Sequence, residues 1–175
     1  MPDLGEEPKS RYLGVRGKIG TYGLRVAACL LLLACSHSEP SLPFDPNIKD
    51  LDMVQLITGE EAQKAIDSLH GMPIKVVRGF IAHYKGVYGK ATVWVSEATT
   101  EDLASEQIDV MIDKMKKSRR SPFSNYRQWN EKGMTVIAFD GMGQVHYLFK
   151  DKTWVYWVSA DGRCIDAVLE HIQDS

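Results

Sequence analysis

Four short segments with a two-residue period constrain the fold of this chain most strongly. In each of them apolar and polar residues tend to alternate, as expected for a strand that buries one face. Short turns rich in glycine, aspartate and lysine separate them, which favours pairing between consecutive segments in an antiparallel sense. The sequence therefore predicts a four-strand meander over residues 126–130, 134–140, 144–150 and 153–159.

The region before the meander predicts a helix, a hairpin and a second helix. Thr58 and Glu61 form a capping box ahead of a periodic apolar stripe that ends at Gly71. Residues 74–84 and 91–98 are rich in valine, isoleucine, threonine and aromatic residues, and two glycines lie between them. A long amphipathic helix then begins after Thr99 or Thr100, with acids in its first turns and bases at its end.

A third amphipathic helix follows the meander, so the predicted order is αββαββββα. We expect an α+β fold in which three helices cover one face of an antiparallel sheet made of the hairpin and the meander. The apolar stripes predict that the core contains Ile66, Leu69, Leu103, Ile108, Met111, Ile165, Val168 and Ile172.

The N-terminal part of the chain is predicted to be an export signal. Arg25 precedes nine uncharged, mostly apolar residues, a run too short to span a bilayer, and a small residue closes it at Ala34. A buried helix would need a polar face, which residues 27–33 do not provide. The acids near Met1 do not fit a basic signal, whereas a start at Val15 would leave three basic residues and no acid before the run, so we expect translation to start at position 15.

Leu32, Leu33, Ala34 and Cys35 resemble the lipobox of bacterial lipoprotein precursors. The resemblance implies cleavage before Cys35, a lipid anchor on its thiol that holds the protein on the membrane, and a location in the cell envelope facing the periplasm or the exterior. Ser36 resembles the residue found in lipoproteins sent to the outer membrane. The predicted organisation is a leader and signal over 1–34, a lipidated cysteine and proline-containing tether over 35–50, and one domain over 51–175.

The charge of the domain argues against nucleic-acid binding, and its cysteine content argues against a disulfide. Without residues 1–34 the chain keeps 20 acidic and 16 basic residues, a formal charge of −4. Such a domain has no basic footprint for nucleic acid. Cys164 is then the only cysteine apart from the lipidated one, so no intramolecular disulfide is expected, and a small buried hydrophobe is favoured over a reactive thiol.

Aromatic residues are concentrated in the last two segments of the meander. Tyr147 and Phe149 share one strand face, Trp154 and Tyr156 share another, and Trp157 points opposite to Tyr156. One interpretation is that these rings pack into a core or a dimer interface. The other is that Tyr147, Trp154, Tyr156 and Trp157 form an exposed surface for a partner protein, or line a groove for an apolar ligand.

His83 and His146 lie in predicted strands beside aromatic residues. Two strand histidines could bind a metal or haem together, but no motif with metal-ligand spacing accompanies them. Histidines bonded to backbone or water are therefore favoured, and we expect no cofactor.

The domain also resembles small uncharacterised bacterial lipoproteins, through residues 58–62, 69–71, 94–96 and 146–149. No activity comes with this resemblance. The leading hypothesis is a non-enzymatic, lipid-anchored envelope protein that binds an envelope partner or a second copy through an aromatic sheet face. The alternatives are a carrier of haem or an apolar small ligand, and an envelope enzyme with a nucleophile and base brought together by the fold.

Overall fold

The computed structural model describes residues 41–117 and 121–175, which belong to one compact unit. The predicted signal, the lipobox with Cys35 and the first part of the predicted tether lie outside the described residues. The elements are β1 (Leu51–Thr58), α1 (Gly59–His70), β2 (Arg78–Gly86), β3 (Gly89–Glu97), α2 (Glu101–Lys117), β4 (Phe123–Glu131), β5 (Met134–Gly141), β6 (Gln144–Asp151), β7 (Trp154–Ala160) and α3 (Ile165–Gln173).

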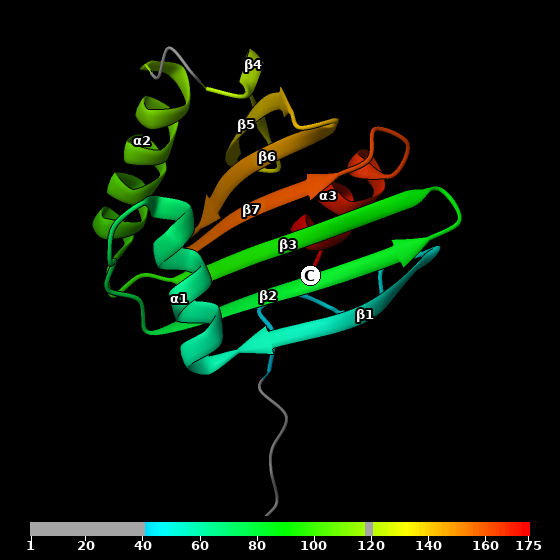
Figure 1. Cartoon of the computed structure of the whole chain (residues 1–175), viewed down its shortest axis with the longest axis horizontal. Helices are drawn as coiled ribbons and strands as arrows, with labels where there is room; N and C mark the ends of the chain where they lie inside the picture. The colour runs from blue at the N-terminus through cyan, green and yellow to red at the C-terminus, as the bar shows by residue number, and fades with distance from the viewer. Residues whose placement is uncertain (1–40, 118–120) are drawn as a thin grey trace, which may run out of the picture. The chain divides into compact units, whose positions relative to one another are not determined.

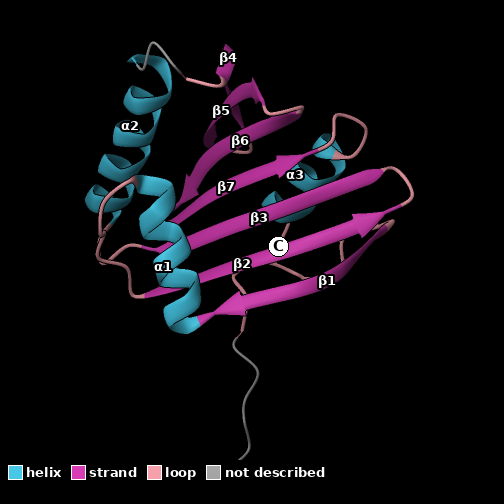
Figure 2. Ribbon diagram, viewed as in Figure 1, coloured by secondary structure: helices cyan, strands magenta, loops and turns pink. Residues whose placement is uncertain are grey.

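The strands form a single seven-stranded antiparallel sheet in the order β1-β2-β3-β7-β6-β5-β4 (Figure 1; Figure 2). Strand β3 pairs with β7, so that Val93 lies opposite Val158 and Trp94 opposite Trp157. This pairing joins the two halves of the chain into one sheet. Helix α2 carries the chain from the middle of the sheet to its far edge, where β4 begins.

The predicted fold is wrong in its element order. Strand β1 was missed, because half of its side chains are exposed, only Leu51 is buried, and it shows no regular alternation of apolar and polar residues. Its register on β2 also shifts between Met53 and Gln55, as is common for an edge strand. The hairpin and the meander are not separate units either, because the β3–β7 pairing makes them continuous.

The prediction that all helices cover one face is also wrong. Helices α1 and α2 lie on one face of the sheet and α3 lies on the other (Figure 1). We call these the α1/α2 face and the α3 face. On the α1/α2 face, Ile108, Met111 and Met115 of α2 pack against side chains that include Leu148 and Trp157. On the α3 face, Val168 and Leu169 pack against a cluster that includes Phe149.

The α3 face is closed by α3 and by the segment that precedes β1. Phe44 and Ile48 are buried in the same cluster as α3, and the Tyr156 hydroxyl donates a hydrogen bond of 3.3 Å to the Pro43 carbonyl. Tyr147 donates a hydrogen bond of 2.9 Å to Asp166 of α3. The predicted tether is therefore wrong for residues 41–50, which are part of the domain.

The helix ends and faces differ in detail from the sequence prediction. Thr58 precedes α1 but makes no side-chain capping hydrogen bond, so the predicted capping box does not form. Gly71 ends α1 in the left-handed conformation at φ 67°, which suits glycine. In α2 the buried positions start at Ala104, whereas Leu103 is 39 % exposed. Leu103 is thus one position off the buried stripe and outside the core, and Leu69 is only partly buried.

Candidate functional site

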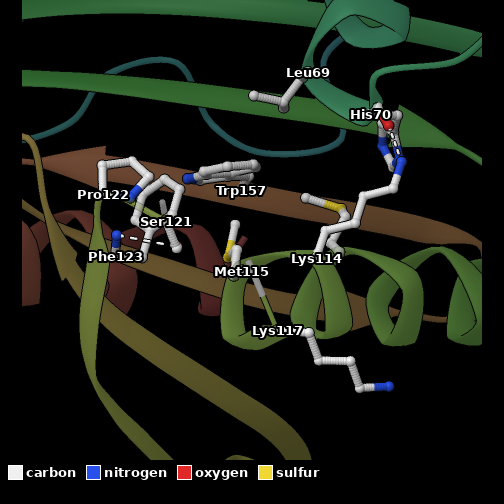
Figure 3. A pocket seen from close by; sticks show the side chains of 10 residues that line it. Leu69, His70, Lys114, Met115, Lys117, Ser121, Pro122, Phe123 and Trp157 are labelled. Atoms are coloured by element: carbon white, nitrogen blue, oxygen red, sulfur yellow. Dashed lines mark hydrogen bonds between the residues drawn. The ribbon is translucent and has the colours of Figure 1, made fainter. Parts of the chain in front are cut away.

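A hollow of about 570 Å³ lies on the α1/α2 face, between the end of α1, the second half of α2 and the start of β4 (Figure 3). The Trp157 indole of β7 lies at its centre, with Leu69 of α1 and Met115 of α2 on either side of it in the view shown. The described residues lining it are Leu69, His70, Met111, Lys114, Met115, Lys117, Ser121, Pro122, Phe123 and Trp157.

A second hollow of about 480 Å³ adjoins the first and has four lining residues in common with it. It extends over Trp94 and Thr92 of β3 and towards the β5–β6 turn. We call the two hollows together the Trp157 groove. The shared residues are Leu69, Pro122, Phe123 and Trp157. Each hollow falls in the volume range of small-molecule sites, which are mostly apolar with a few polar groups.

The Trp157 side chain is fixed by a two-step hydrogen-bond relay. Its indole Nε1–H donates to His146 Nδ1 over 3.0 Å, and His146 Nε2 lies 3.0 Å from the Gly141 carbonyl. A carbonyl only accepts and an indole only donates, so His146 is the neutral tautomer with its proton on Nε2. Burial lowers the pKa of His146, which favours the same neutral form.

Phe123 completes this part of the groove. Its ring meets His146 edge to face at a centroid distance of 5.0 Å and Trp157 at 5.8 Å. Gly141 is required beneath it, because a Cβ at that position would lie 2.5 Å from the Phe123 ring. The first residue of β4 is therefore held against the sheet by a contact that only glycine allows.

The two candidate histidines lie on the same face but far apart. The two histidines are linked by a row of opposed positions across four strands: His83 of β2 faces Thr92 of β3, which faces Ser159 of β7, which faces His146 of β6. Three strand spacings of about 4.8 Å place the two histidines about 14 Å apart. They cannot share a metal ion, and among the described residues no group of three potential metal ligands occurs. His83 Nδ1 lies 3.1 Å from the Thr92 hydroxyl, and both ring nitrogens of His146 have protein partners.

The other end of the groove is basic. Lys114 of α2 donates a hydrogen bond to the carbonyl of His70, at the C-terminal end of α1 (Figure 3). This contact places a cation against the negative end of the α1 dipole. Burial, and then the charge of Lys114, lower the pKa of the His70 imidazole, so His70 does not add a second charge there near neutral pH.

Most of the predicted binding aromatics lie away from the groove. Tyr147 and Tyr156 are buried on the α3 face, and Trp154 is partly buried there against Phe80. Arg78 also lies over the Trp154 ring, at 5.0 Å from its centroid. An exposed aromatic sheet face, on which the partner hypothesis depended, is therefore not present in the described part of the chain. Trp157 alone of the four lies on the α1/α2 face and lines the groove.

Cys164 is buried and free at the start of α3. Its thiol contacts the carbonyl oxygens of Asp161 at 3.3 Å and Lys90 at 3.7 Å, and burial raises its pKa. This environment is that of a structural thiol, because a reactive one needs a lowered pKa.

The sequence analysis did not identify Leu69, Phe123 or Lys114 as site residues. Leu69 was assigned to the core, and the bases at the end of α2 were described only as part of the charge order of an amphipathic helix. A local signal did exist at the start of β4, where Pro122 and Phe123 follow the basic end of α2. It gave no indication that these residues meet the end of α1.

Comparisons with known proteins give little information about the site. No protein-family model matches the sequence, and no curated protein is significantly similar to it. Among the described residues no helix is both long enough and apolar enough to span a bilayer. A solved structure described as a GTP binding regulator from Thermotoga maritima is similar, with 14% sequence identity, a TM-score of 0.48, and coverage of 72% of this chain and 77% of that one.

Proposed function

We propose that this protein is a lipid-anchored, non-enzymatic envelope protein whose domain binds a largely apolar small molecule in the Trp157 groove. The observation that carries the binding role is the groove itself, in which two adjoining hollows of about 570 and about 480 Å³ meet over one indole. Most of the surface of its walls is apolar, and leucine, methionine and aromatic side chains contribute to it. Small-ligand sites combine such walls with a few placed polar groups.

The arrangement favours an elongated ligand over haem. The two hollows adjoin one another along the face between α1 and α2, and their shared lining is a narrow set of four residues. A histidine able to bind iron needs a free ring nitrogen, and both nitrogens of His146 are engaged. A long hydrocarbon chain fits this shape, because its binding needs apolar contact surface along its length and no protein atom that coordinates iron.

Photo-crosslinking tests the binding role directly. The processed full chain, held in phosphatidylcholine nanodiscs, is incubated with a diazirine derivative of hexadecanol, irradiated and digested. We expect labelled peptides from the end of α1, the second half of α2 and the start of β4. The measurement identifies which peptides of the protein are labelled, so probe that stays dissolved in the bilayer does not obscure the result.

Two matched variants make the mapping specific. Leu69→Arg places a long cation in the shared part of the groove and should abolish labelling of the α2 and β4 peptides. Leu103→Arg makes the same change on an exposed part of α2 and should leave the labelling unchanged. Equal labelling in both variants, or labels scattered over the surface, would show that the groove is not a binding site.

The anchor is tested separately. Cys35→Ser should prevent lipid attachment, so the protein should leave the membrane fraction or accumulate as an uncleaved precursor. Cys29→Ser, six residues earlier in the same signal, should be processed and anchored normally. Membrane-bound Cys35→Ser protein of processed size would show that the lipobox assignment is wrong.

A further inference from the structure

We infer that the ligand of the Trp157 groove is a single-chain amphiphile with an anionic head group, bound with its head at the Lys114 and Lys117 end. This inference rests on the proposed function, because it names the ligand class for the same groove. It follows from the distribution of charge along the groove.

The groove is basic at one end, and no acidic side chain lines it among the described residues. Lys114 and Lys117 line the first hollow, and among the described residues no aspartate or glutamate lines either hollow. The chain as a whole has a formal charge of −2, so a lining with lysines and no acid does not reflect its composition. An anionic group entering the first hollow would therefore meet lysines and no lining carboxylate, because Asp113, the ion-pair partner of Lys117, lies outside the lining.

The helix dipole alone does not account for this arrangement. It explains why lysines occur in the last turn of α2, but it does not select the side of the helix they occupy. Lys116, in the same turn, lies over the Tyr126 ring and does not line the groove. Lys114 is three residues after Met111, so both lie on the groove side of α2.

Both lysines keep binding capacity for a ligand. The Lys114 ammonium has three N–H donors, and the His70 carbonyl takes one of them. Lys117 pairs with Asp113, but both side chains are largely exposed, and such a surface pair contributes little and exchanges readily. A carboxylate or phosphate could therefore accept hydrogen bonds from the Lys114 ammonium, while Lys117, whose side chain extends away from Lys114 in Figure 3, adds a positive charge at the same end of the groove.

The opposite end of the groove offers only neutral groups. Thr92, Gln144 and Ser159 line the second hollow together with neutral His146. The two ends differ in charge while the shared middle is formed by Leu69, Phe123 and Trp157. This asymmetry gives an amphiphile one preferred orientation, with its chain running from the lysines over the indole.

The test uses the full-length protein in phosphatidylcholine nanodiscs and compares three diazirine probes that have the same hydrocarbon chain and different head groups. The probes are derivatives of hexadecanoic acid, of a lysophosphatidic acid, and of hexadecanol. We expect half-maximal labelling of groove peptides at a concentration about tenfold lower for the acids than for the alcohol, as expected for a charge-assisted hydrogen bond. The double variant Lys114→Gln with Lys117→Gln should remove this preference, and Lys116→Gln should keep it.

Lys114→Arg is the conservative control. Arginine retains both the charge and the N–H donors of Lys114, so this variant should keep the preference for acids. Preference for only one acid would identify the head group as carboxylate or phosphate. Equal labelling by all three probes, or a preference that survives the double glutamine variant, would overturn this inference and leave the proposed function standing. Absence of groove labelling by every probe would overturn both.

Discussion

The two faces of the sheet are built from the same strands but differ in how completely they are covered. On the α3 face, α3 and residues 41–50 pack against valines and aromatic rings such as Phe149, which is 1 % exposed. On the α1/α2 face, α1 and α2 leave the Trp157 groove between them. The comparison shows that aromatic density marks the core of this domain, whereas the groove is marked by polar positions opposite one another on neighbouring strands.

The side chains that alternate along β6 and β7 explain the difference. Tyr147, Phe149 and Tyr156 point to the α3 face, and the Phe149 and Tyr156 rings stack at a centroid distance of 4.8 Å. His146 and Trp157 point to the other face and are joined by a hydrogen bond. A polar pair needs defined partners, whereas a stacked apolar pair needs only close packing.

The largest expected effect is on the closed face. Phe149→Ala should lower the free energy of unfolding by about 3 to 5 kcal/mol, because it removes a fully buried ring and leaves a cavity. Denaturant titration followed by circular dichroism measures it. Phe123→Ala, the same truncation at the half-buried edge of the groove, should cost clearly less. Equal losses for the two would show that the groove edge is packed as tightly as the core.

An intermediate effect is expected for the relay. Trp157→Phe removes the indole donor and leaves His146 Nδ1 buried without its partner, which should cost about 1 to 3 kcal/mol of unfolding free energy. Trp94→Phe makes the same change of ring at the opposed position on β3. We expect the His146 imidazole resonances in NMR spectra to move in Trp157→Phe and to stay near their positions in Trp94→Phe. Unmoved resonances in both would contradict the relay.

The smallest effect is a pH dependence that belongs to the α1/α2 face. The pKa values of His70 and His146 are both lowered in the folded protein, mainly by burial. The unfolded chain therefore takes up protons first, and stability should fall as the pH drops below the ordinary histidine value of about 6.5. Above that value neither histidine should contribute to a pH dependence.

This effect can be separated from that of the carboxylates. Hydrogen bonds from Arg127 and Asn125 lower the pKa of Asp140 to about 2, so its contribution is lost only in a more acidic range. Denaturant midpoints between about pH 7.5 and about pH 5 isolate the histidines. His146→Gln, whose amide can accept from Trp157, should flatten the curve. A midpoint that stays constant over this range in the wild type would contradict the burial of the two imidazoles as neutral groups.

Local sequence patterns were enough to predict features that depend on neighbouring residues. Alternation located individual strands such as β5 and β6, and helical periodicity located α1 and α3, because each pattern is a property of a few consecutive side chains. The sequence also indicated that Trp157 points away from Tyr156. It missed β1, whose exposed edge position leaves no alternation to detect.

Three features depend on long-range packing: the order of the strands, the placement of α3 on the face opposite α1 and α2, and the groove. The β3–β7 pairing brings Thr92 opposite Ser159, with 66 positions of the sequence between them, and no local pattern encodes that choice. The groove likewise depends on Leu69, Lys114 and Phe123 meeting from three elements. Such contacts follow from how whole faces of the sheet and helices pack together. A strand with an apolar face could pair with several other strands, and only one arrangement packs the complete core.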